Sequence, residues 1–310
     1  MKTYFPTLKG IVKAVDGVDF SIHNEEIVGL VGESGSGKSV TALSIMRLIR
    51  PPGQIVDGKI LFEGEDLLEM SENEMRKVRG GKISMCFQDP MTYLNPVMKI
   101  GDQIIEPLIL HQHLSRDEAV KRAIEMMDLV GIPHSSKRAQ DYPHQLSGGM
   151  RQRILMAISL SCNPKLLIAD EPTTSLDVIV QGLILRQIQD LQKELRNSIL
   201  FITHDMGIVA QLCDEVGIMY AGKILEYAKV ESIFEKPLHP YTQALINSIP
   251  KVGTKKFHII EGMVPNPLEV PNGCRFNPRC QYAKDSCRVE EPKLVDIGDN
   301  HFVSCCLVKE

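Results

Sequence analysis

The length and composition of the chain are those of an ordinary globular protein and exclude several classes. Its 310 residues are 43% hydrophobic and 24% charged, with a formal net charge of −4, so one large domain or two smaller ones can bury a core. The acidic balance disfavours recruitment by nucleic acid or by an anionic membrane. No apolar run approaches the roughly 18 residues of a membrane span, and the start MKTYFPTLKG lacks a signal-peptide core. We therefore expect a cytosolic protein with reduced cysteines.

Hydrophobic patterns predict strands and helices that alternate along most of the chain. In chain order they predict two strands within residues 11–31, a helix at 40–49, short strands at 59–62 and 83–87, mostly helix at 95–162, a buried strand at 166–169, a helix at 178–195 and a buried strand at 198–203. This alternation favours an α/β fold with a largely parallel core sheet.

The pattern changes near Pro237, where prolines become frequent and periodicity weakens. We predict a boundary there, between a domain at 1–236 and an appended module at 237–310. With so little periodicity, the module is expected to lack a core of its own.

The segment GESGSGKS matches the phosphate-binding pattern G-x-x-x-x-G-K-[ST] between a predicted strand and a predicted helix. Its glycines allow backbone N–H groups to wrap phosphate oxygens at a positively polarised helix N-terminus. Lys38 is expected to reach the β- and γ-phosphates, and Ser39 to bind Mg²⁺. A plain Gly/Ser turn is the alternative, which the strand–helix context disfavours. The predicted nucleotide contacts here are Gly32, Ser34, Gly35, Ser36, Gly37, Lys38, Ser39 and Val40.

Two carboxylates follow the buried strand of LLIADEP. Ligands of open α/β sheets bind at the carboxyl ends of strands, so Asp170 is expected to hold Mg²⁺. Glu171 is expected to act as general base toward an attacking water. The alternative is that both carboxylates are only solvated at the end of a strand. The phosphate loop elsewhere in the chain disfavours this alternative.

The segment LSGGMRQR places Ser147, Gly148 and Gly149 before a helical pattern, which makes a second helix N-terminus suited to an anion. Taken alone, it is more simply a loop and a helix cap. Together with the phosphate loop and the acidic pair, it makes the chain resemble the ATPase subunits of ABC transporters. The resemblance implies that LSGG closes over the γ-phosphate of ATP held by a facing subunit, in a head-to-tail dimer.

Further motifs of that family occur in order within residues 1–235. Gln88 resembles the glutamine that senses Mg²⁺ and water, and SLD at Ser175–Asp177 resembles the D-loop. His204 resembles the switch histidine at the γ-phosphate, and Tyr4 or Phe5 resembles the aromatic residue that stacks on adenine. The expected catalytic residues are thus Lys38, Gln88, Glu171 and His204, with Ser39, Gln88 and Asp170 around Mg²⁺. The resemblance implies an ABC-type P-loop ATPase with a RecA-like core sheet, an antiparallel β subdomain and a helical subdomain at about residues 92–165.

Two stretches, FQDPMTYLNPVMKIGDQIIEP and HPYTQALINSIP, resemble the dipeptide/oligopeptide importer ATPases, a group that also handles nickel. That resemblance implies ATP-driven dimer closure that powers peptide import through two transmembrane permease subunits and an extracytoplasmic substrate-binding protein. It also implies a second ATPase subunit, which we expect to be a different chain, and a peripheral place on the cytoplasmic face of the membrane.

Other functions stay open as alternatives to peptide import. A nickel or other small-solute importer would carry the same motifs. A non-transport ABC ATPase usually has tandem cassettes or long coiled coils, and this chain has one set of motifs, no sustained heptads and no basic stripe for nucleic acid. A small-molecule kinase would leave LSGG unexplained.

The stretch between Gln88 and His113 is rich in Met, Ile and Leu. Ordinary core is one interpretation of these side chains. We expect instead an exposed apolar groove that docks a helix of a permease.

Five of the eight cysteines lie at or after Cys274, and four of them have the spacing C-x5-C-x6-C-x17-C. A cytosolic location disfavours disulfides, and structural zinc usually needs closer cysteine pairs. We therefore expect a [4Fe–4S] cluster, with zinc and free thiols as alternatives. The expected ligands are Cys274, Cys280, Cys287 and Cys305, the last chosen over Cys306 because HFVSC resembles the end of the family motif.

Overall fold

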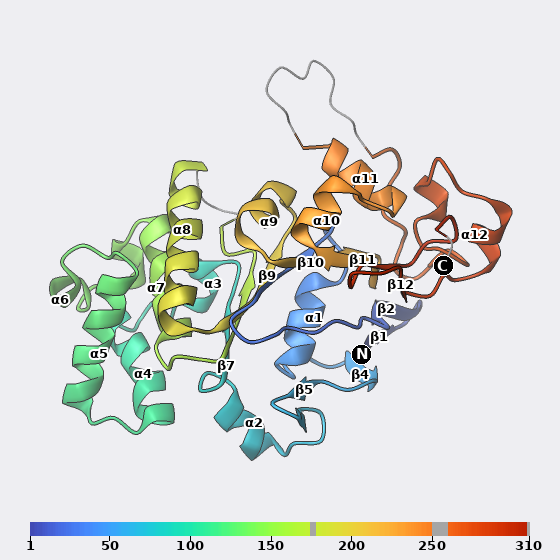
Figure 1. The fold of residues 1–310 in the computed structure, drawn as a ribbon. Helices are drawn as coiled ribbons and strands as arrows, with labels where there is room; N and C mark the ends of the chain where they lie inside the picture. The colour runs from blue at the N-terminus through green and yellow to red at the C-terminus, as the bar shows by residue number, and fades with distance from the viewer. Residues whose placement is uncertain (174–177, 250–259, 309–310) are drawn as a thin grey trace. The chain divides into compact units, whose positions relative to one another are not determined.

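The structure is a computed structural model that describes residues 1–173, 178–249 and 260–308. The chain divides into two compact units, residues 1–21, 27–68 and 202–310 in the first and residues 22–26 and 69–201 in the second (Figure 1). This division follows contacts between residues, and the functional boundary at 236 stays a prediction. Within the described ranges, no helix has the length and apolar content of a membrane span.

The first unit contains a small antiparallel sheet and a set of central strands. The small sheet has the order β2-β1-β4, from Gly10–Asp16, Lys2–Thr7 and Gln54–Asp57. The central strands have the order β12-β13-β11-β10-β3, from Val295–Asp296, Phe302–Val303, Lys223–Lys229, Glu215–Tyr220 and Ile27–Val31. β10 pairs with β3 in parallel, whereas β10–β11, β11–β13 and β12–β13 are antiparallel. The sheet is therefore more mixed than the sequence pattern predicts.

Short helices and one hairpin complete the first unit. They are α1 (Lys38–Ile45), the hairpin β5–β6 (Leu61–Phe62 and Glu65–Asp66), α9 (Met206–Leu212), α10 (Val230–Glu235), α11 (Pro240–Asn247), the 3₁₀ turn η2 (Asn277–Arg279) and α12 (Asp285–Val289).

The second unit is mostly helical. Its helices are α2 (Glu72–Val78), α3 (Pro90–Tyr93), α4 (Ile100–Gln112), α5 (Arg116–Leu129), α6 (Ser135–Arg138), the turn η1 (Pro143–Gln145), α7 (Gly148–Leu160) and α8 (Val178–Leu195). Its strands β7 (Ile83–Cys86) and β8 (Leu166–Asp170) pair in parallel, next to β9 (Ser198–Thr203), whose last two residues belong to the first unit.

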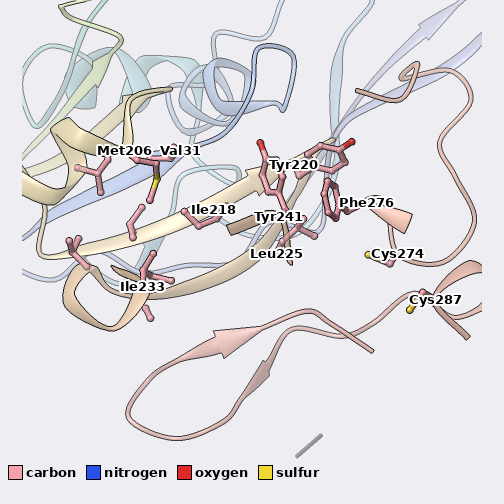
Figure 2. Packing of buried hydrophobic residues seen from close by; sticks show 14 residues of the cluster. Val31, Met206, Ile218, Tyr220, Leu225, Ile233, Tyr241, Cys274, Phe276 and Cys287 are labelled. Carbon is pink, nitrogen blue, oxygen red and sulfur yellow. The ribbon is translucent and has the colours of Figure 1, made fainter. Parts of the chain in front are cut away.

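The C-terminal segment, predicted to lack a core of its own, packs into the hydrophobic core of the first unit. Cys274, Phe276 and Cys287 are buried in one cluster with Tyr220 and Tyr241, where the first unit has its own hydrophobic core (Figure 2). The Phe276 ring lies 5.4 Å from Tyr220 and 5.2 Å from Tyr241 between centroids. Strand β13 also pairs with β11. Contacts distant in sequence therefore order a segment whose local periodicity is weak.

Candidate functional site

The phosphate loop joins β3 to α1 in a conformation that requires glycine at two positions. Gly37 precedes the helix at a φ of 106°, in the left-handed region that side chains avoid. A Cβ at Gly37 would collide with the carbonyl oxygen of Ala14, and one at Gly32 with that of Met219. The loop is therefore closely enclosed by neighbouring backbone, which keeps its N–H groups in one arrangement.

Two buried polar groups belong to this loop. Lys38 is 4% exposed, and its Nζ donates to the carbonyl oxygens of Gly32 at 2.7 Å and Glu33 at 3.1 Å. The hydroxyl of Ser36 is buried without a hydrogen-bond partner among the described residues. Beside Gly35, where a Cβ would meet no atom within 4 Å, these groups fit an anionic ligand that approaches the backbone closely.

The second unit brings Gln88 and Glu171 together. Because β7 and β8 run in parallel with Cys86 opposite Ala169, the residues that follow both strands emerge at the same edge. The Gln88 Nε2 donates to Glu171 Oε2 at 3.1 Å. Glu171 has a φ of 47°, a conformation that is costly for a side chain other than glycine. This backbone conformation directs the carboxylate of Glu171 at Gln88, and the sequence analysis predicts that both residues contact the attacking water.

The donors predicted for Mg²⁺, on Ser39, Gln88 and Asp170, are oxygen atoms, as this hard cation prefers. Asp170 is 6% exposed at the end of β8, in the second unit. Ser39 is the second residue of α1, in the first unit. The chemistry of this donor set fits Mg²⁺.

The signature segment forms a capped and accessible helix N-terminus. Ser147 precedes α7, and its Oγ accepts a hydrogen bond from the Met150 N–H at 3.3 Å. Both Ser147 and Gly148 are exposed, and a Cβ at Gly148 would meet nothing within 4 Å. The helix therefore presents its N-terminus where an outside ligand can approach.

Two of the remaining predicted nucleotide contacts, His204 and Tyr4, lie in the first unit. His204 is exposed after β9. The Tyr4 hydroxyl donates to Asp16 Oδ1 at 2.5 Å, and burial together with this bond raises the pKa of Tyr4 to about 12. The choice between Tyr4 and Phe5 for adenine stays a prediction. Ser175 and Asp177, predicted for the D-loop, lie outside the described residues.

Four of the five C-terminal thiols belong to one packed cluster, in which Cys274 and Cys287 are buried and Cys280 and Cys306 are partly buried. Burial raises the pKa of Cys274 to about 12, with smaller contributions from Cys305, Cys306 and Cys280. Burial also raises the pKa of Cys306 to about 11, and its next cause is Cys287. Thiols gathered in this way are the ligand type of iron–sulfur clusters. In the part of the chain that the structure describes, however, no three His, Cys, Asp or Glu side chains are arranged to hold a metal ion.

The stretch between Gln88 and His113 exposes part of its apolar content. Met91, Tyr93 and Val97 are 60%, 49% and 81% exposed, and Leu110 is 65% exposed. Other apolar residues of α4 are core, among them Ile100, Ile104, Ile105 and Leu108. The predicted segment is therefore apolar on the surface before α4 and mainly buried within it.

Sequence reasoning missed four charged residues that pair across the first unit. Arg279 binds Glu33 of the phosphate loop, and Arg275 binds Asp16. Both arginines stand beside predicted cluster cysteines in GCRFNPRC. Their spacing gives no sign of their partners, because these lie 246 and 259 residues away.

Comparisons with known proteins agree with these motifs. Residues 15–174 match the ABC transporter family, and residues 225–287 match the oligopeptide/dipeptide transporter C-terminal region. The oligopeptide transport ATP-binding protein AppD of Bacillus subtilis is 50% identical, over 100% of this chain and 95% of its own. Its counterpart OppD of Haemophilus influenzae is 46% identical, over 99% and 95%.

Solved ABC cassettes share the fold. The dimeric bacterial ABC transporter cassette MJ0796 has a TM-score of 0.66 at 27% identity, over 74% of this chain and 96% of its own. CbiO1 of Clostridium perfringens, part of the cbiONQ transporter complex, has a TM-score of 0.63 at 27% identity, over 76% and 90%.

Proposed function

The chain belongs to the ABC transporter family and carries its ATP-hydrolysing cassette, and on that premise we propose that it is the subunit that powers import of di- or oligopeptides. The main observation in support of ATP hydrolysis is the 3.1 Å hydrogen bond between Gln88 and Glu171, in a chain that also has a phosphate loop. The match of residues 225–287 to the peptide transporter C-terminal region supports the peptide substrate.

The proposed hydrolysis depends on positioning and charge stabilisation. The buried Lys38 and the loop N–H groups bind the phosphates, and Ser39 and Asp170 hold Mg²⁺, which neutralises developing charge when it is bound. Glu171 accepts the proton of the attacking water, and Gln88 orients that water. His204 contacts the transferred phosphoryl group.

The proposed assembly is a head-to-tail dimer of cassettes. Ser147, Gly148 and Gly149 contact the γ-phosphate bound by the facing subunit, and Asp177 contributes from the D-loop. The exposure of Ser147 and Gly148 supports this role, as does the dimer of the similar cassette MJ0796. We propose a different ATPase chain as the second subunit.

The proposed place of the protein is the cytoplasmic face of the membrane, on two permease subunits served by an extracytoplasmic substrate-binding protein. The exposed side chains of Met91, Tyr93 and Val97 support a docking surface for a permease helix. Arg151 Nη1 contacts the Met91 sulfur at 2.7 Å, which adds a cation at the rim of that surface. Closure of the cassettes then moves the permeases.

We also propose that Cys274, Cys280, Cys287 and Cys305 hold a [4Fe–4S] cluster. Burial raises the pKa values of Cys274, Cys280 and Cys305, and neighbouring cysteines raise them further, which supports proximity of the predicted ligands. A cluster requires thiolates, so the four thiols must lose their protons and approach one another on assembly. Anaerobically purified protein should be brown, with about four irons per chain. Cys280→Ser should lose the colour and Cys162→Ala should keep it, whereas colourless protein with stoichiometric zinc contradicts the cluster.

The function is tested with Glu171→Gln in the purified full chain. This variant keeps the shape and loses the base, so hydrolysis should fall at least about 100-fold while ATP binding persists. Glu194→Gln, an exposed change on α8, should keep the wild-type rate. Near-normal turnover by Glu171→Gln would exclude Glu171 as the base.

The transport role needs a separate measurement. A pull-down from membranes should recover permeases with the wild-type chain, and charge substitutions at Met91 and Val97 should abolish that recovery but spare ATP binding. Recovery of ribosomes or DNA without permeases would contradict transport. If the intact complex takes up labelled peptide and does not take up nickel, peptides are the substrate class.

A further inference from the structure

Two arginines of the cysteine segment, here residues Gly273–Cys287, reach the nucleotide-binding part of the first unit. The side chains of Arg275 and Arg279 are each only 4% exposed. Removal of a guanidinium from water is costly, and the cost is offset only where carboxylates and carbonyl oxygens take up its donors. The residues that take up these donors therefore indicate what each arginine holds in place.

Arg279 binds the phosphate loop through Glu33. Its Nη1 lies 2.9 Å and 3.1 Å from the two carboxylate oxygens of Glu33 and 3.3 Å from the Tyr220 hydroxyl. The other nitrogens donate to the carbonyls of Ile260 and Glu261, at 3.2 Å and 3.0 Å. All three nitrogens are used, so the guanidinium has one orientation and holds the Glu33 side chain with it.

The backbone of Glu33 carries this constraint to Lys38. Its carbonyl oxygen accepts from Lys38 Nζ at 3.1 Å, and its N–H donates to the Tyr241 hydroxyl at 3.1 Å. The side chain, the N–H and the carbonyl of one loop residue are thus all engaged. The lysine proposed to bind phosphates rests on a carbonyl whose residue is held by Arg279.

Arg275 makes a parallel connection on the other side of the loop. It binds the carboxylate of Asp16 and the carbonyl of Ala221. The next residue, Gly222, donates its N–H to the Ser36 carbonyl of the phosphate loop at 2.7 Å. Burial opposes ionisation of Asp16, but the bond from Tyr4 and the charge of Arg275 together lower its pKa. Arg275 therefore holds the turn that supports the far end of the loop.

We propose that Arg279 is a positioning residue for the phosphate loop: through Glu33 it sets the carbonyl that orients Lys38, so the cysteine segment controls ATP affinity. The proposal rests on the assignment of this loop to ATP. A purely structural role, in which the ion pair only attaches the C-terminal segment to the core, is the competing explanation. A carboxylate anywhere on the core could attach the C-terminal segment. The carboxylate that binds Arg279 belongs instead to Glu33, the second residue of the phosphate loop.

The test compares ATP affinity with stability in the purified full chain. Arg279→Met should raise the Kd for ATP about tenfold, and Arg279→Lys, which keeps the charge and loses the fork, should raise it less. Glu33→Gln should also raise the Kd, and because Glu33 is more exposed than Arg279 this variant keeps the test possible if Arg279→Met fails to fold. The double variant should be no worse than the worse single variant, since both remove the same interaction.

A matched control separates positioning from attachment. Val303→Ala weakens the packing of β13 at a side chain that is fully buried and that is not a member of the cluster of Tyr220, Tyr241 and Phe276. It should lower the Tm and leave the Kd for ATP unchanged. Folded Arg279→Met or Glu33→Gln with wild-type affinity, or a Val303→Ala that raises the Kd equally, overturns the proposal. Failure of the wild-type chain to bind ATP would instead reject the proposed function.

Discussion

The phosphate loop and the cysteine segment Gly273–Cys287 lie in the same compact unit, yet different interactions determine their conformations. The loop depends on glycines at positions where a Cβ would collide with neighbouring backbone, and on a lysine bonded six residues back, to Gly32. The cysteine segment has only one short helix and a 3₁₀ turn, and its partners Glu33 and Asp16 are more than 240 residues away. A motif made by local geometry can be found in a sequence, and one made by distant contacts cannot.

The largest expected effect tests the distant contacts. Phe276→Ala removes a ring that is 2% exposed and packs on Tyr220 and Tyr241, so the free energy of unfolding should fall by about 3–5 kcal/mol. Chemical denaturation followed by circular dichroism measures it. Tyr282→Ala, at a position 51% exposed, should cost less than about 0.5 kcal/mol. Equal, small losses in both would mean that the segment adds little to the core.

The next effect tests the local geometry. Gly37→Ala places a side chain at a φ of 106° and against the Ala14 carbonyl, which should weaken ATP binding about 100-fold, or about 2.8 kcal/mol. Titration with ATP measures the change. Gly148→Ala, where a Cβ meets no neighbour, should leave the affinity of the isolated chain unchanged. A Gly37→Ala protein with normal affinity would contradict the enclosed loop.

A smaller effect concerns His239, which is buried beside Phe276 at 5.9 Å between ring centroids. Burial lowers its pKa to about 3, so between about pH 6.5 and pH 3 the unfolded chain binds more protons than the folded one. Stability should therefore fall as the pH falls, by about 2 kcal/mol from pH 7 to pH 5. Denaturation midpoints at both pH values measure it.

His239→Asn should remove this part of the pH dependence, because asparagine does not titrate and can still accept from the Tyr241 N–H as His239 does. The exposed His23→Asn should keep it. The same slope in wild type and His239→Asn would show that other groups cause the acid sensitivity.

The smallest effect is again local. Ser115 and Glu118 form a capping box at the start of α5, with bonds of 3.4 Å and 2.9 Å. Ser115→Ala should lower the free energy of unfolding by about 1 kcal/mol, whereas Ser115→Asn should keep most of the stability that the cap provides. Thermal unfolding distinguishes the two, and an alanine variant as stable as the asparagine variant would show that the cap is unimportant.

The sequence alone determined the elements whose patterns are long or continuous. The predicted helix 178–195 and strand 198–203 have the same bounds in the structure, because an amphipathic period over eighteen residues and an unbroken apolar run leave few alternatives. The short strand predicted at 59–62 is reduced to Leu61–Phe62, since two-residue pairing depends on its partner. The phosphate loop, Gln88 and Glu171 could be predicted as site residues because each follows a strand, and Asp170 because it ends one, and their roles stay predictions.

Only the tertiary structure decided where the C-terminal segment belongs. Its burial depends on Tyr220 and Tyr241 from other elements, and the destinations of Arg275 and Arg279 depend on how distant strands pair. Neither leaves a local signal, because hydrophobic burial and ion pairing depend on distance in space and not along the chain. The identity of Glu33 is plain in the sequence, and its role as the partner of Arg279 comes only from the fold.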